Sequence, residues 1–184
     1  MRLPDDVLRV CDLNLRPPFY SRDVVEFALQ TADVFKLNDV EAITLDALFH
    51  DQIPSALQII GDATNGVARE RFDREKAELD RRLDLWARSW MRAFDLKSIV
   101  LTCGANGAYL FNGDVAAFAP APKTVVKDAV GAGDAFAATT VVGLLQRRDE
   151  AQIVAAAAKR AAFVCSQEGG TPPIPADFAD PFIL

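Results

Sequence analysis

The chain has 184 residues, 51% of them hydrophobic, and its formal net charge at pH 7 is −6. That length predicts a single domain over residues 1–184, and the acidic balance excludes a large basic surface for nucleic acids or anionic membranes. A single histidine, His50, leaves almost no room for a Ser-His-Asp triad or a metal centre with several histidines. Because the sequence has no run of about 18 uncharged apolar residues and no signal-peptide core, we expect a cytoplasmic protein that does not span a membrane.

The first third of the chain alternates between short apolar runs and amphipathic segments. The runs Val7 to Cys11 and Ala32 to Leu37 predict buried strands, and each is followed at once by polar residues. Ser21 is a suitable N-cap for a helix from about Arg22 to Thr31, and a second helix is expected from Asp39 to Phe49. This alternation is typical of a parallel α/β sheet, in which ligands bind at the carboxyl ends of the strands.

The segment from about Val67 to Phe94 has strongly helical periodicity, and it follows an ambiguous stretch, residues 51–66, that we interpret as a short helix and a loop. Charged residues cover most of this helix, and we expect them to be solvated rather than to bind a partner. The apolar stripe of the helix is predicted to belong to the core rather than to an oligomer contact. It consists of Phe72, Leu79, Leu83, Trp86, Trp90 and Phe94.

The second half of the chain again predicts strands and helices. The expected elements are a strand at Ser98–Thr102, a hairpin with arms at Ala108–Phe111 and Val115–Phe118, a short strand at Thr124–Lys127, and helices over about Ala132–Gln146 and Glu150–Ser166. The hairpin is indicated by Asn112-Gly113, because Asn-Gly between two apolar runs favours a tight turn. The whole pattern predicts an α/β fold with a largely parallel sheet and helices on both of its faces.

Before the predicted Ala132–Gln146 helix stands the sequence DAVGAGDAF, residues 128–136. Gly131 and Gly133 let backbone N–H groups approach a ligand closely, and a helix that starts there adds its positive end, so the turn predicts a site for an anion such as phosphate. Asp134 has two explanations. It either stabilises the first helical turn against the helix dipole, or it accepts a proton from a substrate hydroxyl while the N–H groups of residues 132–134 stabilise a phosphoryl group in transfer.

Asp128 to Asp134 form a D-x-x-G-A-G-D frame that resembles the signature of the ribokinase-like (PfkB) carbohydrate kinases, which usually have threonine in place of Ala129. Three further segments resemble motifs of this family, in the same order, and the match extends over about residues 7–175. They are Asp12-Leu13-Asn14-Leu15-Arg16-Pro17, similar to D-x-N-x-R-P of fructokinase and 2-keto-3-deoxygluconate kinase members; Asn38-Asp39-Val40-Glu41, similar to N-x-x-E; and Thr102-Cys103-Gly104-Ala105-Asn106-Gly107, similar to T-x-G-x-x-G.

This resemblance implies a three-layer α/β/α ribokinase-like fold with a mostly parallel central sheet. It also implies an enzyme that transfers the γ-phosphate of ATP to a hydroxyl of a sugar or sugar acid. Asp134 would be the catalytic base, and Gly131, Ala132 and Gly133 would form the anion hole. ATP and a small carbohydrate are the implied ligands, with Mg²⁺ and, in some members, K⁺ as cofactors.

The resemblance assigns further residues to ATP and Mg²⁺. Thr102, Gly104 and Gly107 would contact the nucleotide, while Asn38 and Glu41 would contact Mg²⁺ through water and help to bind phosphate. A second interpretation of the last two residues stays open. Asn38 and Glu41 have the spacing of a capping box at the start of a helix, which requires no ligand.

Two more assignments follow from the same resemblance. Arg16 would reach the phosphates or an acidic group of the substrate, although an arginine after a strand is often a surface ion-pair partner. Asp128 and the backbone near Gly169-Gly170 resemble parts of the monovalent-cation site that some members have.

Members of the family have a sizeable segment before the D-x-N-x-R-P motif, and it supplies the first strands, a sugar-binding motif and a β lid. We expect these parts to be missing here, so that the strand Val7 to Cys11 becomes an exposed edge through which copies of the chain associate. The alternative function is then a nucleotide-binding, self-associating remnant with little or no turnover. An NAD-binding Rossmann domain is disfavoured, because the glycine turn comes late and no suitably spaced acidic residue ends a following strand.

Overall fold

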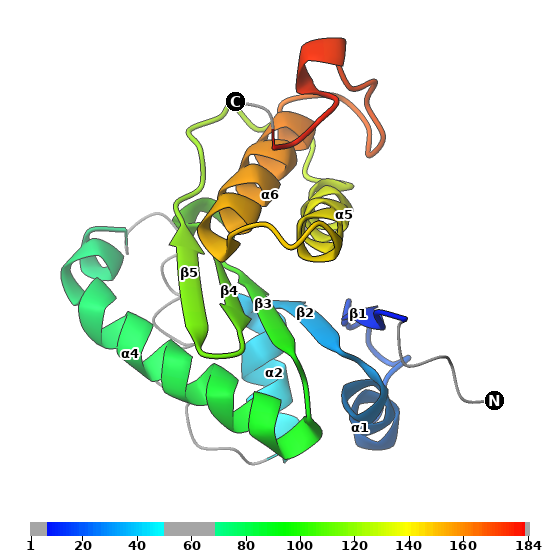
Figure 1. The fold of residues 1–184 in the computed structure, drawn as a ribbon, viewed down its shortest axis with the longest axis vertical. Helices are drawn as coiled ribbons and strands as arrows, with labels where there is room; N and C mark the ends of the chain where they lie inside the picture. The colour runs from blue at the N-terminus through cyan, green and yellow to red at the C-terminus, as the bar shows by residue number, and fades with distance from the viewer. Residues whose placement is uncertain (1–6, 50–68, 183–184) are drawn as a thin grey trace. The chain divides into compact units, whose positions relative to one another are not determined.

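The computed structural model describes residues 7–49 and 69–182, and its strands form one mixed sheet in the order β1-β2-β3-β4-β5 (Figure 1). The strands are β1 (Val10–Asp12), β2 (Val34–Asn38), β3 (Ser98–Thr102), β4 (Ala108–Asn112) and β5 (Val115–Ala119). The helices are α1 (Arg22–Thr31), α2 (Asp39–Phe49), α4 (Arg69–Phe94), α5 (Ala132–Leu145) and α6 (Glu150–Cys165), with single 3₁₀ turns at η1 (Gly104–Asn106) and η2 (Ala176–Phe178). The predicted α/β class is confirmed, while the short helix and loop predicted for residues 51–66 lie outside the described residues.

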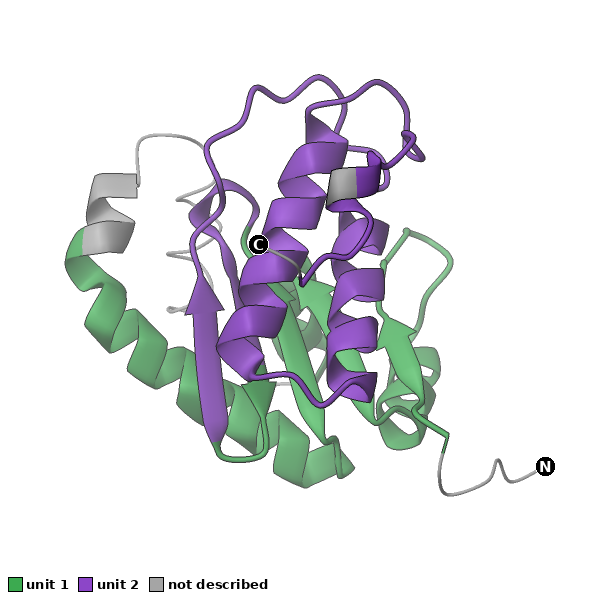
Figure 2. Cartoon of the chain, turned by 45° about the horizontal axis from the view of Figure 1, so that its top comes forward, with its two compact units in different colours: residues 1–103, 111–114 green, residues 104–110, 115–184 purple. Residues whose placement is uncertain are grey.

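The chain divides into two compact units. Unit 1 contains residues 1–103 and 111–114, and unit 2 contains residues 104–110 and 115–184 (Figure 2). The expectation of one domain over the whole chain stays a prediction. In the described residues of both units, no helix is long and apolar enough to cross a membrane.

Unit 1 contains the parallel part of the sheet. Strand β2 pairs in parallel with both β1 and β3, and Asn38 at the end of β2 lies opposite Thr102 at the end of β3. The start of β3 lies beside the end of β4, because the Gly113 amide donates to the Lys97 carbonyl. Strand β4 therefore runs antiparallel to β3, and the sheet is mixed rather than mostly parallel as predicted. The carboxyl ends of the three parallel strands therefore meet at one edge, where the polar motifs were expected.

The helices of unit 1 begin where the sequence predicts. The Ser21 hydroxyl accepts a hydrogen bond from the Val24 amide and caps α1, and α2 has its predicted bounds. Strand β1 starts at Val10 rather than at Val7, because the preceding amide, that of Arg9, donates to the side chain of Asp33 instead of extending the strand.

The stripe on α4 is confirmed as core where its side chains are described. Leu79, Leu83, Trp86 and Trp90 are buried, and Phe94 is half-buried, whereas the side chain of Phe72 lies outside the described part. The buried indole N–H of Trp86 donates to the carboxylate of Asp46 on α2 over 2.8 Å. That bond satisfies a polar group which would otherwise be costly inside a core.

In unit 2 the helices α5 and α6 lie side by side, and α6 packs on β5 (Figure 1). Gly143 permits the close approach of the two helices, because a Cβ atom there would lie only 2.6 Å from the side chain of Ile153. The strand predicted at Thr124–Lys127 is wrong. The side chain of Val125 is 81% exposed, and the amide of Lys127 donates to the carbonyl of Cys165 rather than to a neighbouring strand.

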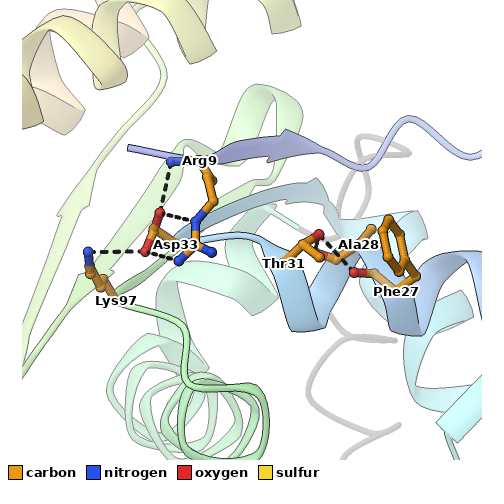
Figure 3. Close-up of polar contacts among 6 residues, drawn as sticks. All are labelled: Arg9, Phe27, Ala28, Thr31, Asp33 and Lys97. Atoms are coloured by element: carbon orange, nitrogen blue, oxygen red, sulfur yellow. Dashed lines mark hydrogen bonds and ion pairs between the residues drawn. The ribbon is translucent and has the colours of Figure 1, made fainter. Parts of the chain in front are cut away.

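The start of each parallel strand in unit 1 is connected to Asp33, which is 2% exposed (Figure 3). Its carboxylate accepts hydrogen bonds from the backbone and the guanidinium of Arg9, and it forms an ion pair with Lys97 over 3.0 Å. The backbone of Asp33 bonds to Arg9, Lys97 and Ser98. The hydrogen bonds from the Arg9 side chain hold the pKa of Asp33 well below its usual range.

We predict that Asp33→Asn lowers the free energy of unfolding by about 2–4 kcal/mol, because several charge-assisted hydrogen bonds are lost together. The effect should depend on pH. A carboxyl whose pKa is depressed by folding stabilises the folded state above the unfolded pKa, about 4 for Asp, and this contribution disappears as the pH falls toward the folded pKa. Urea unfolding at pH 7 and pH 3 measures the difference, which should be smaller at pH 3. Asp114→Asn is the control, because that side chain is fully exposed, and an equal effect of both variants would contradict the prediction.

Candidate active site

The glycine turn leads directly into helix α5 of unit 2. Gly131 occupies the N-cap with a left-handed backbone, φ +78°, and provides no side-chain capping bond. Helices α1 and α6 differ, because side chains cap them: Ser21 in α1, and Asp149, which accepts from two amides, in α6. The first N–H groups of a helix have no partner within it. At α5 they are thus left without a side-chain cap, as an anion site requires.

The turn is fixed against the segment that follows α6. A Cβ atom at residue 131 would overlap the carbonyl oxygen of Gly170, so glycine is required by close approach as well as by backbone conformation. The amides of Lys127 and Asp128 both donate to the carbonyl of Cys165 at the end of α6. The carboxylate of Asp128 accepts from the amides of Val130 and Gly169 over 2.9 and 3.2 Å.

Asp134 lies in the first turn of α5 and is exposed. Gly133 beside it is exposed as well, whereas Ala132 is half-buried and its amide makes a long bond, 3.4 Å, to the carbonyl of Ala129. A carboxylate and several helix-terminal N–H groups therefore share one accessible turn. Such a group of residues can accept a proton and bind an anion at neighbouring positions.

In unit 1, Asn38 and Glu41 form a reciprocal capping box at the start of α2. The Asn38 side chain accepts from the Glu41 amide over 2.8 Å, and the Glu41 carboxylate accepts from the Asn38 amide over 2.9 Å. The other oxygen of Glu41 accepts from the amide of Leu15, 26 residues earlier, over 2.9 Å. The capping interpretation of this pair is confirmed as geometry, and Glu41 also anchors the loop after β1.

The hydrogen bonds that the structure gives for the predicted residues Arg16 and Thr102 are long. Arg16 is exposed, and its guanidinium donates to the carbonyl of Leu15 over 3.4 Å. Thr102 lies opposite Asn38 at the end of β3, and its hydroxyl makes a long contact, 3.5 Å, to the carbonyl of Leu37. Gly104 and Gly107 belong to unit 2 and have positive φ angles. The structure thus brings Thr102, Asn38 and Glu41 together in unit 1.

Sequence reasoning missed two residues at this edge of the sheet. Lys36, on β2, is almost completely buried and forms an ion pair with Asp12 over 2.7 Å. A lysine inside an apolar strand is a recognisable indication that a carboxylate lies on a neighbouring strand. Asp39 is also buried. One of its oxygens accepts from the Val40 amide, the other has no hydrogen-bond partner among the described residues, and burial raises the pKa of this carboxyl.

A protein-family comparison matches the model described as pfkB family carbohydrate kinase to residues 86–177, which are half of the chain. The chain belongs to this family. The matched residues contain the glycine turn, Asp134 and the loop from Thr102 to Gly107, whereas Arg16, Asn38 and Glu41 precede them. No curated protein sequence matches the chain.

Solved structures of several kinases match the α/β fold of this chain. The chain matches a ribokinase from Thermotoga maritima with a TM-score of 0.62 and 16% identity, covering 90% of this chain and 44% of that one. The 2-dehydro-3-deoxygluconokinase from the same organism matches with a TM-score of 0.62 and 18% identity, covering 89% of this chain and 46% of that one. The aminoimidazole riboside kinase from Salmonella enterica matches with a TM-score of 0.59 and 20% identity, covering 88% of this chain and 46% of that one. The chain therefore spans less than half the length of these relatives.

The polar residues of unit 1 are compatible with the Mg²⁺ that the family implies. Within the described ranges 7–49 and 69–182, no three acidic, histidine or cysteine side chains are grouped so as to bind a metal directly. Mg²⁺ keeps several of its waters in proteins, so contact through water is sufficient. Each carboxylate oxygen of Glu41 uses one lone pair for an amide and retains a second that can accept from such a water.

We predict that Glu41→Gln lowers the free energy of unfolding by about 1–2 kcal/mol, because glutamine has one acceptor oxygen for two amides, those of Leu15 and Asn38. Urea unfolding monitored by tryptophan fluorescence measures the loss. Glu26→Gln is the matched control, since Glu26 is on α1 and contacts the exposed side chain of Gln30. If both variants are as stable as the unsubstituted chain, Glu41 does not anchor the loop after β1.

Proposed function

We propose that this chain carries the phosphoryl-transfer machinery of a cytoplasmic ATP-dependent sugar kinase with a three-layer α/β/α fold. In this proposal Asp134 removes the proton from the acceptor hydroxyl as that oxygen attacks the γ-phosphate of ATP. The N–H groups of Gly131, Ala132 and Gly133 bind the negative charge that develops on the transferred group. Positioning and electrostatic stabilisation supply most of the catalysis in this kind of reaction.

The observation that carries the proposal is the exposed Asp134 in the first turn of a helix whose N-cap, Gly131, has no side chain. Both residues lie in a D-x-x-G-A-G-D frame inside the part of the chain that matches the family. A stabilising role against the helix dipole needs only the charge of Asp134, and it gives the uncapped N–H groups at the start of α5 no ligand. A proton acceptor beside a phosphate site gives a use to both the carboxylate and these N–H groups.

The motifs of unit 1 have supporting roles in the same proposal. Asn38 and Glu41 hold Mg²⁺ through water, and the capping box that they form fixes the direction in which their oxygens point. Arg16 is exposed and long enough to contact phosphate or an acidic group of the acceptor. Thr102, Gly104 and Gly107 contact the nucleotide. When bound, Mg²⁺ neutralises charge on the β- and γ-phosphates.

The proposed ligands are Mg·ATP and a small molecule with a sugar hydroxyl. The Salmonella enterica relative was crystallised with aminoimidazole riboside and an ATP analogue, and a nucleoside kinase from Burkholderia thailandensis with ADP-inosine. Because these are less than 25% identical to this chain, they support a sugar-bearing acceptor as a class and no particular sugar. The alternative is a chain that binds nucleotide without transferring phosphate.

We predict that Asp134→Asn lowers phosphoryl transfer from Mg·ATP to a panel of sugars, sugar acids and nucleosides by at least about 100-fold, because asparagine cannot accept the proton. Binding of ATP and the thermal midpoint should change little, since Asp134 is exposed. A coupled ADP-release assay, with equilibrium binding of ATP, measures both. Asp23→Asn is the matched control, an exposed acid in the first turn of α1.

The possible outcomes separate the two functions. Activity that disappears in Asp134→Asn and persists in Asp23→Asn supports the kinase. Activity that persists in Asp134→Asn contradicts the role of this residue as base. If ATP binds and the unsubstituted chain transfers phosphate to no acceptor, the nucleotide-binding alternative is correct.

We further propose that copies of the chain associate through β1, the last strand in the sheet order. Arg9 and Leu13 bond to β2, so the N–H and carbonyl groups of Val10 and Asp12 face the other way, as alternate residues do in a parallel ladder. In the described part of the chain no further strand pairs with this edge, and an edge of this kind accepts another strand. Light scattering over a range of concentrations should show a rising mass, and Val10→Lys should reduce it; a monomer at every concentration would contradict the proposal.

A further inference from the structure

The carboxylate of Asp128 connects two segments of unit 2 that are 41 residues apart in sequence. One oxygen accepts from the amide of Val130, within the glycine turn, over 2.9 Å. The other accepts from the amide of Gly169, in the loop after α6, over 3.2 Å. Each oxygen is thus directed at a different segment, and the side chain acts as a bridge between them.

Further contacts join the residues of the turn to the end of α6 and to the loop after it. The amides of Lys127 and Asp128 both donate to the carbonyl of Cys165, over 2.8 and 3.2 Å. The backbone of Gly131 lies so close to Gly170 that a Cβ atom at residue 131 would overlap its carbonyl oxygen. A Cβ atom at residue 170 would in turn lie 2.9 Å from the side chain of Val130. The turn is therefore packed against the loop after α6 along its length.

The charge of Asp128 needs an explanation, because a second carboxylate six residues before Asp134 repels the anion that the turn is proposed to bind. Hydrogen bonds from two backbone N–H groups offset that charge and make it structurally useful. Asparagine at this position has one acceptor oxygen, so it can satisfy the Val130 amide or the Gly169 amide and not both. The bridge thus requires an acid.

We infer that Asp128 is a positioning residue that fixes the glycine turn to the loop after α6 and so aligns the N–H groups of residues 131–133 for a phosphoryl group. The inference rests on the proposed function for the ligand of the turn, and on the two hydrogen bonds of Asp128 for the bridge itself. The family resemblance assigns Asp128 to a cation, whereas this inference assigns its two oxygens to backbone amides of this chain.

The test compares Asp128→Asn with Asp149→Asn in the full chain. Asp149 is a matched control: its carboxylate also accepts from two backbone amides, those of Ala151 and Gln152, at the start of α6. Both bonds of Asp149 go to one oxygen and to one segment, so asparagine can keep them. Any general effect of removing an acid that binds amides should therefore appear in both variants, and an effect of breaking a bridge should appear in Asp128→Asn alone.

The first measurement is amide hydrogen exchange by NMR, which needs no activity. In Asp128→Asn we expect exchange at Val130, Gly169 or both to be at least tenfold faster than in the unsubstituted chain, with exchange in the middle of α5 and α6 unchanged. The second is steady-state kinetics, where kcat should fall about tenfold while KM for the acceptor stays within a factor of two. Asp149→Asn should change neither.

The outcomes are distinguishable from those of the proposed function. If the unsubstituted chain has no activity, the function fails and the exchange measurement still decides whether the bridge exists. Unchanged exchange at both amides in Asp128→Asn overturns the inference. It is also overturned if K⁺, compared with tetramethylammonium, slows exchange at Gly169 in the unsubstituted chain and not in Asp128→Asn, because Asp128 then acts by holding a cation. Faster exchange with an unchanged kcat overturns the positioning role.

Discussion

The arrangement of unit 1 depends on the buried carboxylate of Asp33. It lies where the parallel strands begin, and its side chain and backbone together contact Arg9, Lys97 and Ser98. Fixing the amino ends of strands in a parallel sheet also fixes which residues meet at their carboxyl ends. Asn38 and Thr102 lie opposite each other for this reason, since the register that begins beside Asp33 continues to the end of β2 and β3.

Carboxylates that accept from distant backbone amides occur in the motifs as well. Asp33, Glu41 and Asp128 each use both carboxylate oxygens, and each accepts from a backbone amide far away in sequence: Arg9 for Asp33, Leu15 for Glu41 and Gly169 for Asp128. A carboxylate suits this task because it accepts several hydrogen bonds and donates none. Loops that would otherwise be held by few contacts thereby acquire definite positions. Acidic residues thus hold segments of the backbone in place in both units.

Much of the fold follows from sequence, and the departures have local causes. Helices α1 and α2 have their predicted bounds, because capping residues and apolar spacing act within a helix and do not depend on distant parts of the chain. Strand ends depended on contacts that no short window contains. The Arg9 amide bonds to a side chain 24 residues away, and the Lys127 amide bonds to Cys165, so one strand is shorter than predicted and another does not form.

The residues of the candidate site could be predicted from the sequence, whereas the backbone groups that their side chains contact could not. The motif residues were recognisable because four segments resemble motifs of the family in the same order, although each segment alone has another explanation. The partner of Glu41 on the loop after β1 and that of Asp128 after α6 could not be predicted, because each is a backbone amide, and every residue except proline has one. Lys36 was visible in the sequence as a charge within an apolar strand, and it indicates a carboxylate partner such as Asp12.

The acids of the motifs divide by what they contact. Asp128 directs both of its oxygens at backbone amides, which offsets its charge and fixes the glycine turn to the loop after α6, and Glu41 in unit 1 likewise binds the amides of Leu15 and Asn38. Asp134 instead is exposed in the first turn of a helix that lacks a side-chain cap. A base must keep an accessible oxygen that can take up a proton, whereas a residue that only positions a loop works best when both oxygens are engaged. The exposed carboxylate of Asp134 thus meets this requirement of the proposed base, and the engaged oxygens of Asp128 suit its proposed positioning role.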